Sequence, residues 1–153
     1  MKHKTKKTKV IFTSTIHVNK KNSYGISKKK SEEELIKLNK KNIQLCIYRL
    51  TNIFGKWSKP FYNSVIATFC YQILNNKKIK IINNEKINFI YIDDLINDFL
   101  NIIKVNNFKK IFREVSPQKR ISVKMLSKKL YFFNEKLKQS EIPVIKDDFD
   151  KKL

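Results

Sequence analysis

The chain has 153 residues and a formal net charge of +21, because 34 lysines and arginines stand against 13 aspartates and glutamates. This length suits a single domain with a buried core. The basic start MKHKTKKTK leads into only a few apolar residues, which excludes a signal peptide or a membrane span there and predicts a cytoplasmic protein with no membrane partner.

Apolar strand patterns and helix patterns alternate along the chain, which predicts an α/β fold. In chain order we expect a strand over residues 10–14, a helix over 22–41, a strand over 44–50, a loop over 51–62, a helix over 63–74, strands over 78–82 and 89–92, a helix from residue 93, a strand over 112–115, a helix from residue 123 and an ordered or fraying tail to residue 153. The last two long helices carry apolar stripes that we expect to be buried: Leu95, Ile96, Phe99, Leu100 and Ile103 in one, and Val123, Leu126, Leu130, Phe133 and Leu137 in the other. Asp93 and Asp94 suit the positive N-terminal end of the first of these helices, and Ser122 suits the cap of the second.

The high positive charge is typical of proteins that bind nucleic acid. The lysines recur along the whole chain, however, together with an excess of asparagine and isoleucine, which favours a general compositional bias and a solvated lysine surface. No basic stretch stands out as a stacking platform of interleaved aromatic residues. Nucleic acid is therefore the least favoured partner.

The chain contains two cysteines. Cys46 and Cys70 each lie alone in an apolar run, without the spacing of metal ligands. We therefore expect two buried, reduced thiols and no bound metal.

The most informative stretch is VIFTSTIHVNKKNSYGISK, residues 10–28. It reads as a strand that ends in hydroxyl residues, a short polar link, and a helix on which Tyr24 and Lys28 share one face. Reduction of a ketone by hydride requires a proton for the developing alkoxide, and a lysine ammonium near a phenol lowers the phenol pKa from about 10 so that the phenol can donate that proton. A threonine hydroxyl opposite can hold the substrate oxygen, as an oxyanion donor does. The pattern thus indicates carbonyl–alcohol redox chemistry.

A plainer interpretation of the pair is a surface tyrosine on a lysine-rich helix. With 34 basic residues in 153, a basic residue four positions after a tyrosine arises easily by chance. The surroundings are more specific, since a hydroxyl run, a tight link and a further apolar strand frame the pair. From the residues alone, both interpretations stay open.

Three segments together resemble extended short-chain dehydrogenases/reductases of the NAD-dependent epimerase/dehydratase family: FTSTIHV with NSYGISKKKSEEEL, then YRLTNIFG, then INFIYIDDLINDFL. The resemblance implies the C-terminal part of a Rossmann-like doubly wound sheet with the small substrate-binding subdomain. It implies that Thr15, Tyr24 and Lys28 are catalytic. It also implies NADP or NAD as the cofactor, contacted by Tyr24, Lys28, Leu50 and Thr51.

The resemblance further implies a UDP-sugar substrate, contacted by His17, Asn52, Asn63, Ser64 and Thr68. YRLTNIFG matches an Arg-x-x-Asn-x-Phe-Gly strand end, with Asn52 as the substrate-contacting asparagine. The nine-residue gap from Thr15 to Tyr24, the segment GKWSKPFYNSVIATFC and the ending IPVIKDDFDKKL resemble a subgroup, the capsular-polysaccharide reductases that reduce C4 of a UDP-2-acetamido-2,6-dideoxy-hexos-4-ulose with NADPH. That subgroup has serine in place of Thr15 and glutamine in place of His17, and threonine keeps the hydroxyl.

Members of the family hold the dinucleotide at a Gly-x-x-Gly-x-x-Gly turn, whereas this chain has only Gly25 and Gly55. We therefore expect a basic leader over residues 1–8, a partial reductase domain over 9–145 that lacks the N-terminal nucleotide-binding half, a tail over 146–153, and no cupin-like domain. Such a chain would pair with a complementary N-terminal fragment and, once completed, form a homodimer. The alternatives are a non-catalytic remnant or dimerisation module of this fold, and a basic nucleic-acid-binding protein.

The strand over residues 10–14 is apolar throughout, as suits a central parallel strand. Without its neighbours it becomes an exposed hydrophobic edge. We therefore expect the isolated chain to be poorly stable or prone to aggregate unless a complementary fragment or a second copy covers this edge.

Overall fold

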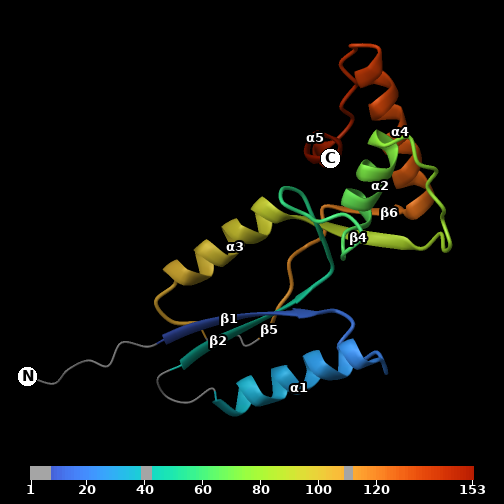
Figure 1. Ribbon diagram of the computed structural model, residues 1–153. Coiled ribbons are helices and arrows are strands. Elements are labelled where there is room, and N and C mark those ends of the chain that lie inside the picture. The colour runs from blue at the N-terminus through green and yellow to red at the C-terminus, as the bar shows by residue number, and fades with distance from the viewer. Residues whose placement is uncertain (1–7, 39–42, 109–111) are drawn as a thin grey trace, which may run out of the picture. The chain divides into compact units, whose positions relative to one another are not determined.

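The structure of the chain is a computed structural model that describes residues 8–38, 43–108 and 112–153. The chain divides into two compact units, the first made of residues 1–51 and 95–115, the second of residues 52–94 and 116–153. The described strands are β1 Thr8–Thr15, β2 Ile43–Leu50, β3 Asn52–Phe54, β4 Lys86–Tyr91, β5 Phe112–Arg113 and β6 Lys119–Ser122 (Figure 1). The described helices are α1 Ser23–Leu38, α2 Val65–Leu74, α3 Ile92–Lys104, α4 Val123–Lys138 and α5 Asp148–Lys152.

The first unit is built on a three-stranded parallel sheet in the order β1-β2-β5. β1 and β2 pair along their whole length, from Thr8 opposite Ile43 to Thr15 opposite Leu50. α1 and α3 lie on opposite faces of this sheet (Figure 1). β2 is therefore buried at most positions, whereas β1 is an edge strand with no described strand on its other side.

A polar network joins β2, α3 and β5 within the first unit. The buried Tyr48 donates its hydroxyl hydrogen to Asp98 Oδ2 at 2.6 Å, and Arg113 Nε donates to the same oxygen at 2.7 Å. The Tyr48 ring also packs edge-on against Phe99, with ring centroids 4.7 Å apart. The Arg113 guanidinium holds the pKa of the Asp98 carboxyl below its ordinary value.

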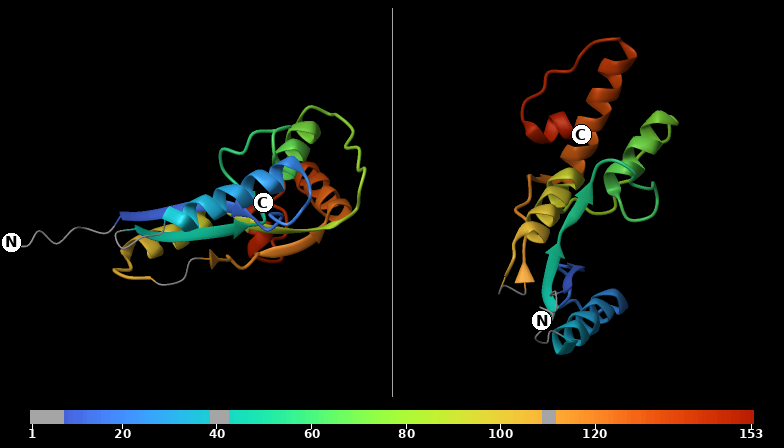
Figure 2. Two further views of the ribbon diagram at one scale, coloured as in Figure 1. Left: turned by 90° about the horizontal axis from the view of Figure 1, so that it is seen from below. Right: turned by 90° about the vertical axis from the view of Figure 1, so that its left-hand side faces the viewer.

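The second unit has its own sheet and core. β3 and β4 are parallel, β4 and β6 are antiparallel, and the order is β3-β4-β6. Helices α2 and α4 lie side by side in this unit, as Figure 2 also shows. The buried core side chains come from both helices, the sheet and α5: Phe54, Ile66, Phe69, Ile73, Phe89, Ile121, Val123, Leu126, Leu130 and Phe149.

The predicted α/β fold class is confirmed, and the first two strands pair in parallel. The predicted strand over 78–82 is wrong, because this segment is irregular: Ile79 and Ile81 pack on the core from one side, which produces the alternation without a pairing partner. The short strands β3 and β6 were not predicted, since three or four residues carry too little periodicity. Residues 1–7 of the predicted leader and the last residues of the helix predicted over 22–41 lie outside the described residues.

The predicted stripe of α3 is buried only in part. Leu95 is buried, but Ile96, Leu100 and Ile103 are 44, 48 and 51% exposed, and Ile102 is buried instead. The helix meets the sheet of the first unit through Asp98 and Phe99, so the side that carries Ile96, Leu100 and Ile103 is only partly covered by the described chain. In α4, Leu137 is likewise 68% exposed.

The expected tail is ordered at its end, where α5 buries Phe149. Cys46 is buried and Cys70 half-buried, and the described residues form no disulfide with either cysteine. Within the described ranges, no group of three or more histidines, cysteines or carboxylates is placed to hold a metal ion. The described helices include none that is long and apolar enough to cross a membrane.

Candidate active site

Tyr24 and Lys28 lie on the first turns of α1, beside the end of β1. Lys28 Nζ donates a hydrogen bond to the Thr13 carbonyl at 3.0 Å and lies 5.1 Å from the centroid of the Phe12 ring. Tyr24 is 55% exposed. The lysine is thus anchored on the neighbouring strand, while the phenol one turn earlier is open to a ligand.

The hydroxyl of Thr15 lies at the carboxyl end of β1. Thr15 is buried, and its Oγ1 accepts a hydrogen bond from the His17 backbone N–H at 3.2 Å. Leu50 is opposite Thr15 in the strand register and accepts a hydrogen bond from the Ile16 N–H at 3.1 Å. Thr15, His17, Leu50 and the following Thr51 therefore gather at the carboxyl edge of the parallel sheet, which is where such sheets bind ligands.

The start of α1 depends on Asn22 and Gly25, neither of which is among the predicted site residues. Asn22 Oδ1 accepts from the Gly25 N–H at 2.8 Å, as an N-cap side chain does. A Cβ on Gly25 would lie 2.5 Å from the Lys20 carbonyl oxygen and 2.7 Å from that of His17. Only glycine allows this close approach, so the Tyr-Gly pair fixes the helix start against the loop that precedes it. In the sequence, the glycine directly after Tyr24 was the feature that could have indicated this close backbone approach.

A buried ion pair holds the same helix to β2. Glu32 has a side chain only 3% exposed, and it accepts from Arg49 Nη2 at 2.7 Å and from Arg49 Nε at 3.2 Å. Burial raises the pKa of Glu32, but hydrogen bonds from Arg49 and Ser14 and the charge of Arg49 together outweigh burial, so the pKa lies below its ordinary value. Glu32 follows Lys28 by one turn, and the pair therefore orients the helix that carries the candidate catalytic residues.

The other predicted substrate-binding residues belong to the second unit. Asn52 and Asn63 are exposed. Ser64 is the N-cap of α2 and accepts from the Ala67 N–H. Thr68 Oγ1 accepts from the Phe61 N–H at 2.9 Å and donates to the Ser64 carbonyl at 2.8 Å. Both hydroxyls thus support the loop between β3 and α2.

That loop interleaves lysines with aromatic residues, in GKWSKPFY, which corrects the expectation that no basic stretch does so. A cavity of about 320 Å³ lies beside it, lined by residues of the loop, α2, the ends of β3 and β4 and the chain end, among them Trp57, Ser64, Tyr91 and Lys152. Gly55 begins the loop with φ +122°, a conformation that favours glycine.

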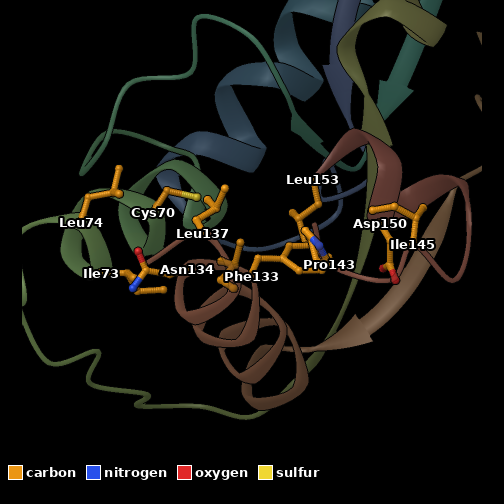
Figure 3. Close-up of a pocket in the computed structure, with 11 residues that line it drawn as sticks. Cys70, Ile73, Leu74, Phe133, Asn134, Leu137, Pro143, Ile145, Asp150 and Leu153 are labelled. Atoms are coloured by element: carbon orange, nitrogen blue, oxygen red, sulfur yellow. The ribbon is translucent and has the colours of Figure 1, made fainter. Parts of the chain in front are cut away.

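A second cavity, of about 280 Å³, is apolar (Figure 3). Its walls come from α2, α4 and the C-terminal segment, and include Cys70, Phe133 and Leu137. Burial raises the pKa of the Cys70 thiol, which makes it a poor nucleophile.

A strand-end hydroxyl beside a parallel sheet, with a tyrosine and a lysine on the next helix, is the arrangement that the sequence resemblance implies for a short-chain dehydrogenase site. The chain belongs to the NAD dependent epimerase/dehydratase family, whose model matches residues 3–113. This confirms the resemblance found in the sequence. Members of this family bind NAD or NADP.

The chain is 38% identical over 131 residues to the UDP-2-acetamido-2,6-beta-L-arabino-hexul-4-ose reductase of Pseudomonas aeruginosa. The matched segment covers 84% of this chain and 35% of the relative. The structure of this chain is similar to that of the capsular polysaccharide assembling protein CapF from Staphylococcus aureus, with a TM-score of 0.84 and 30% identity, over 97% of this chain and 42% of that one. It also shares the fold of UDP-glucuronic acid 4-epimerase from Bacillus cereus in complex with NAD, with a TM-score of 0.71 and 20% identity over 83% of this chain and 46% of that one. The chain thus spans between a third and a half of the length of these relatives.

Proposed function

We propose that this chain supplies the catalytic part of a nucleotide-sugar reductase. The substrate would be a UDP-amino-deoxy sugar with a ketone at C4, made during capsule or O-antigen polysaccharide synthesis in the cytoplasm. The observation that carries the proposal is the position of Tyr24 and Lys28 on α1 beside the carboxyl end of β1, in a chain 38% identical to a UDP-sugar reductase.

The residues of the first unit fit the nicotinamide end of the cofactor. The exposed Tyr24 hydroxyl and the neighbouring Lys28 ammonium can hold the nicotinamide ribose, with Leu50 and Thr51 at the adjoining strand end. A bound NADPH or NADH would supply the hydride. The phosphate-binding Gly-x-x-Gly-x-x-Gly turn must come from other residues, because only two glycines are present.

Within this assignment each catalytic residue has one task. The Tyr24 hydroxyl donates its proton to the oxygen at C4 as charge develops there. Lys28, held in place by the Thr13 carbonyl, stabilises the resulting phenolate. Thr15 orients the C4 oxygen through a hydrogen bond.

The substrate contacts follow the family pattern. His17 and Asn52 would contact the sugar and the diphosphate, and Asn63, Ser64 and Thr68 would border the nucleotide. Ser64 and Thr68 would act through the loop that they support rather than through free hydroxyls. The completed enzyme would be a homodimer.

The test is reconstitution. The chain is co-expressed with a polypeptide that carries the family's strand, Gly-x-x-Gly-x-x-Gly turn and helix, and NADPH oxidation is followed with the 4-keto UDP-sugar. We expect turnover that falls by about a hundredfold or more in Tyr24→Phe, since a general acid contributes about 10²–10⁴-fold. Ser27→Ala, on the same helix, should leave the rate unchanged. A correctly assembled complex without turnover would overturn the proposal.

A non-catalytic interaction module is the second candidate, and the uncovered edge of β1 favours it. This role predicts that UDP-sugar protects the chain from proteolysis while NADPH has no effect on the assembled complex. A nucleic-acid-binding role would instead give salt-dependent retention on DNA.

A further inference from the structure

Three large aromatic side chains stand exposed in the loop between β3 and α2, which we call the aromatic loop (residues 55–63). Trp57 is 97% exposed, Tyr62 80% and Phe61 62%. Single exposed apolar residues are common, but clustered ones mark contact sites. The aromatic loop is therefore a candidate ligand-binding segment.

The backbone of the aromatic loop is held in an unfavourable conformation. Trp57 has φ 67° and Phe61 has φ 59°, in the left-handed region that bulky side chains rarely adopt. The hydrogen bond from the Phe61 N–H to Thr68 and the edge-on contact of its ring with Tyr71, at 5.3 Å, stabilise this conformation. Such strain is typical of segments that present a side chain to a ligand.

The cavity beside the aromatic loop limits what that ligand can be. At about 320 Å³ it is near the lower end of small-molecule sites, so it suits one part of a larger ligand. Its two cations are already compensated: Lys56 pairs with Asp93 at 3.0 Å, and Lys152 pairs with Asp94 at 3.0 Å and Asp148 at 2.8 Å. A phosphate would meet these carboxylates, so an uncharged polar ring fits better.

We propose that Trp57 stacks on the nucleobase of the nucleotide sugar and that the adjoining cavity takes the uncharged base rather than the diphosphate. This inference rests on the proposed function, since it names the base-binding part of the same substrate site. Aromatic stacking is tolerant of base identity, and an exposed indole leaves its ring face open to a base. Ser64 and Thr68 contribute by fixing the aromatic loop.

Trp57 is the single tryptophan of the chain, so its fluorescence reports on this position alone. The chain is titrated with UDP, with UDP-N-acetylglucosamine and with glucose 1-phosphate, and calorimetry measures the same three ligands. We expect both uridine nucleotides to quench the fluorescence at the concentrations where they bind. Glucose 1-phosphate has the charge but no base and should not quench.

Variants separate stacking from folding. Trp57→Ala should weaken UDP binding about tenfold or more, whereas Trp57→Phe should keep it within about threefold. Tyr131→Ala, which removes a partly exposed aromatic residue on α4, is the matched control and should bind like the parent chain. Circular dichroism verifies that each variant folds.

UDP binding without quenching, or with equal affinity in Trp57→Ala, would overturn this inference and leave the proposed reductase function intact. Equal quenching by glucose 1-phosphate, or tighter and salt-dependent binding of a single-stranded oligonucleotide, would also overturn it. A third outcome is that UDP quenches the fluorescence of the chain but the reconstituted complex does not oxidise NADPH. That outcome would support the base site and contradict the proposed function.

Discussion

Glu32 and Arg49 form a two-hydrogen-bond ion pair that joins α1 to β2, with Nη2–Oε2 and Nε–Oε1 distances of 2.7 and 3.2 Å. Glu32 lies four residues after Lys28, which lies four after Tyr24, so the three share one line along the helix. The buried carboxylate therefore sets the rotation of α1 about its axis. That rotation decides where the lysine and the phenol point.

Glu32→Gln should destabilise the first unit. The substitution keeps the shape of the side chain but leaves Arg49 without its counter-ion. Because the Arg49 side chain is 34% exposed and can turn toward water, we expect a loss of about 2–3 kcal/mol rather than the full cost of breaking a buried pair. Urea unfolding followed by circular dichroism measures this loss.

The matched control is Glu34→Gln, two residues away on the same helix. Glu34 pairs with Lys37, and both side chains are more than two-thirds exposed. Its removal should leave the unfolding midpoint unchanged, because surface pairs contribute little. Equal losses in the two variants would mean that the buried pair does not orient α1.

Asp98 makes the stability of the first unit depend on pH. The hydrogen bond from Arg113, opposed by burial and aided by Tyr48, gives this carboxyl a lowered pKa in the folded state. The folded state therefore binds the Asp98 proton less readily than the unfolded chain, whose aspartate pKa is about 3.9. The stabilisation is fully present above that value and is lost as pH falls through the lower folded pKa.

The measurement is the free energy of unfolding as a function of pH below about 5. The parent chain should lose stability steeply on acidification. Asp98→Asn should be less stable at neutral pH and show a shallower slope in the acid range. A slope identical to that of the parent would show that Asp98 does not form a stabilising network with Tyr48 and Arg113.

The sequence predicted the elements that have long apolar periodicity, and its candidate site residues came from one local motif. β1, α1 and β2 were located because their patterns run over many residues, and Thr15, Tyr24 and Lys28 came from the same stretch. The segment with Ile79 and Ile81 was assigned wrongly because alternation arises equally in a loop that packs on one side. Short strands that depend on pairing partners distant in the chain carry no comparable local signal.

The burial of α3 and the conformation of the aromatic loop could not be predicted for a different reason. The apolar stripe of α3 shows which residues are suited to burial, yet only the neighbours that are present decide which are covered. Left-handed conformations at Trp57 and Phe61 oppose their intrinsic preferences, and at Phe61 a tertiary contact with Thr68 stabilises the conformation. Such conflicts are expected at functional segments.

Gly25→Ala should disturb the candidate active site through the backbone. The new methyl group would meet the Lys20 and His17 carbonyl oxygens at 2.5 and 2.7 Å, so the start of α1 must move away from the preceding loop. Overpacking of this kind costs about 1–3 kcal/mol. Urea unfolding measures the cost, and faster hydrogen exchange of the amides of residues 17–20 would locate it.

The control for this change is Ser27→Ala, an exposed position on the same helix where alanine is a better helix former. It should be neutral or slightly stabilising. If Gly25→Ala behaves in the same way, the close approach at Gly25 is not required and the loop can adapt.

β1 should make the isolated chain associate with itself. It is an eight-residue edge strand with half-buried Val10, Ile11 and Phe12, and no described strand covers its outer side. Exposed edges of this kind promote strand pairing between chains, and a lysine introduced in the middle of the strand should weaken this pairing. We therefore expect species heavier than a monomer in size-exclusion chromatography with light scattering, and a shift toward monomer in Ile11→Lys.

The control Ile82→Lys adds the same charge at a position that is 91% exposed in the second unit. If both variants reduce association equally, the added charge acts by raising general solubility and not by blocking the edge of β1. A parent chain that is soluble, monomeric and unfolds cooperatively would contradict the prediction outright. A polypeptide that completes the sheet should abolish association in the parent chain, because it would occupy the same edge of β1 that a second copy uses.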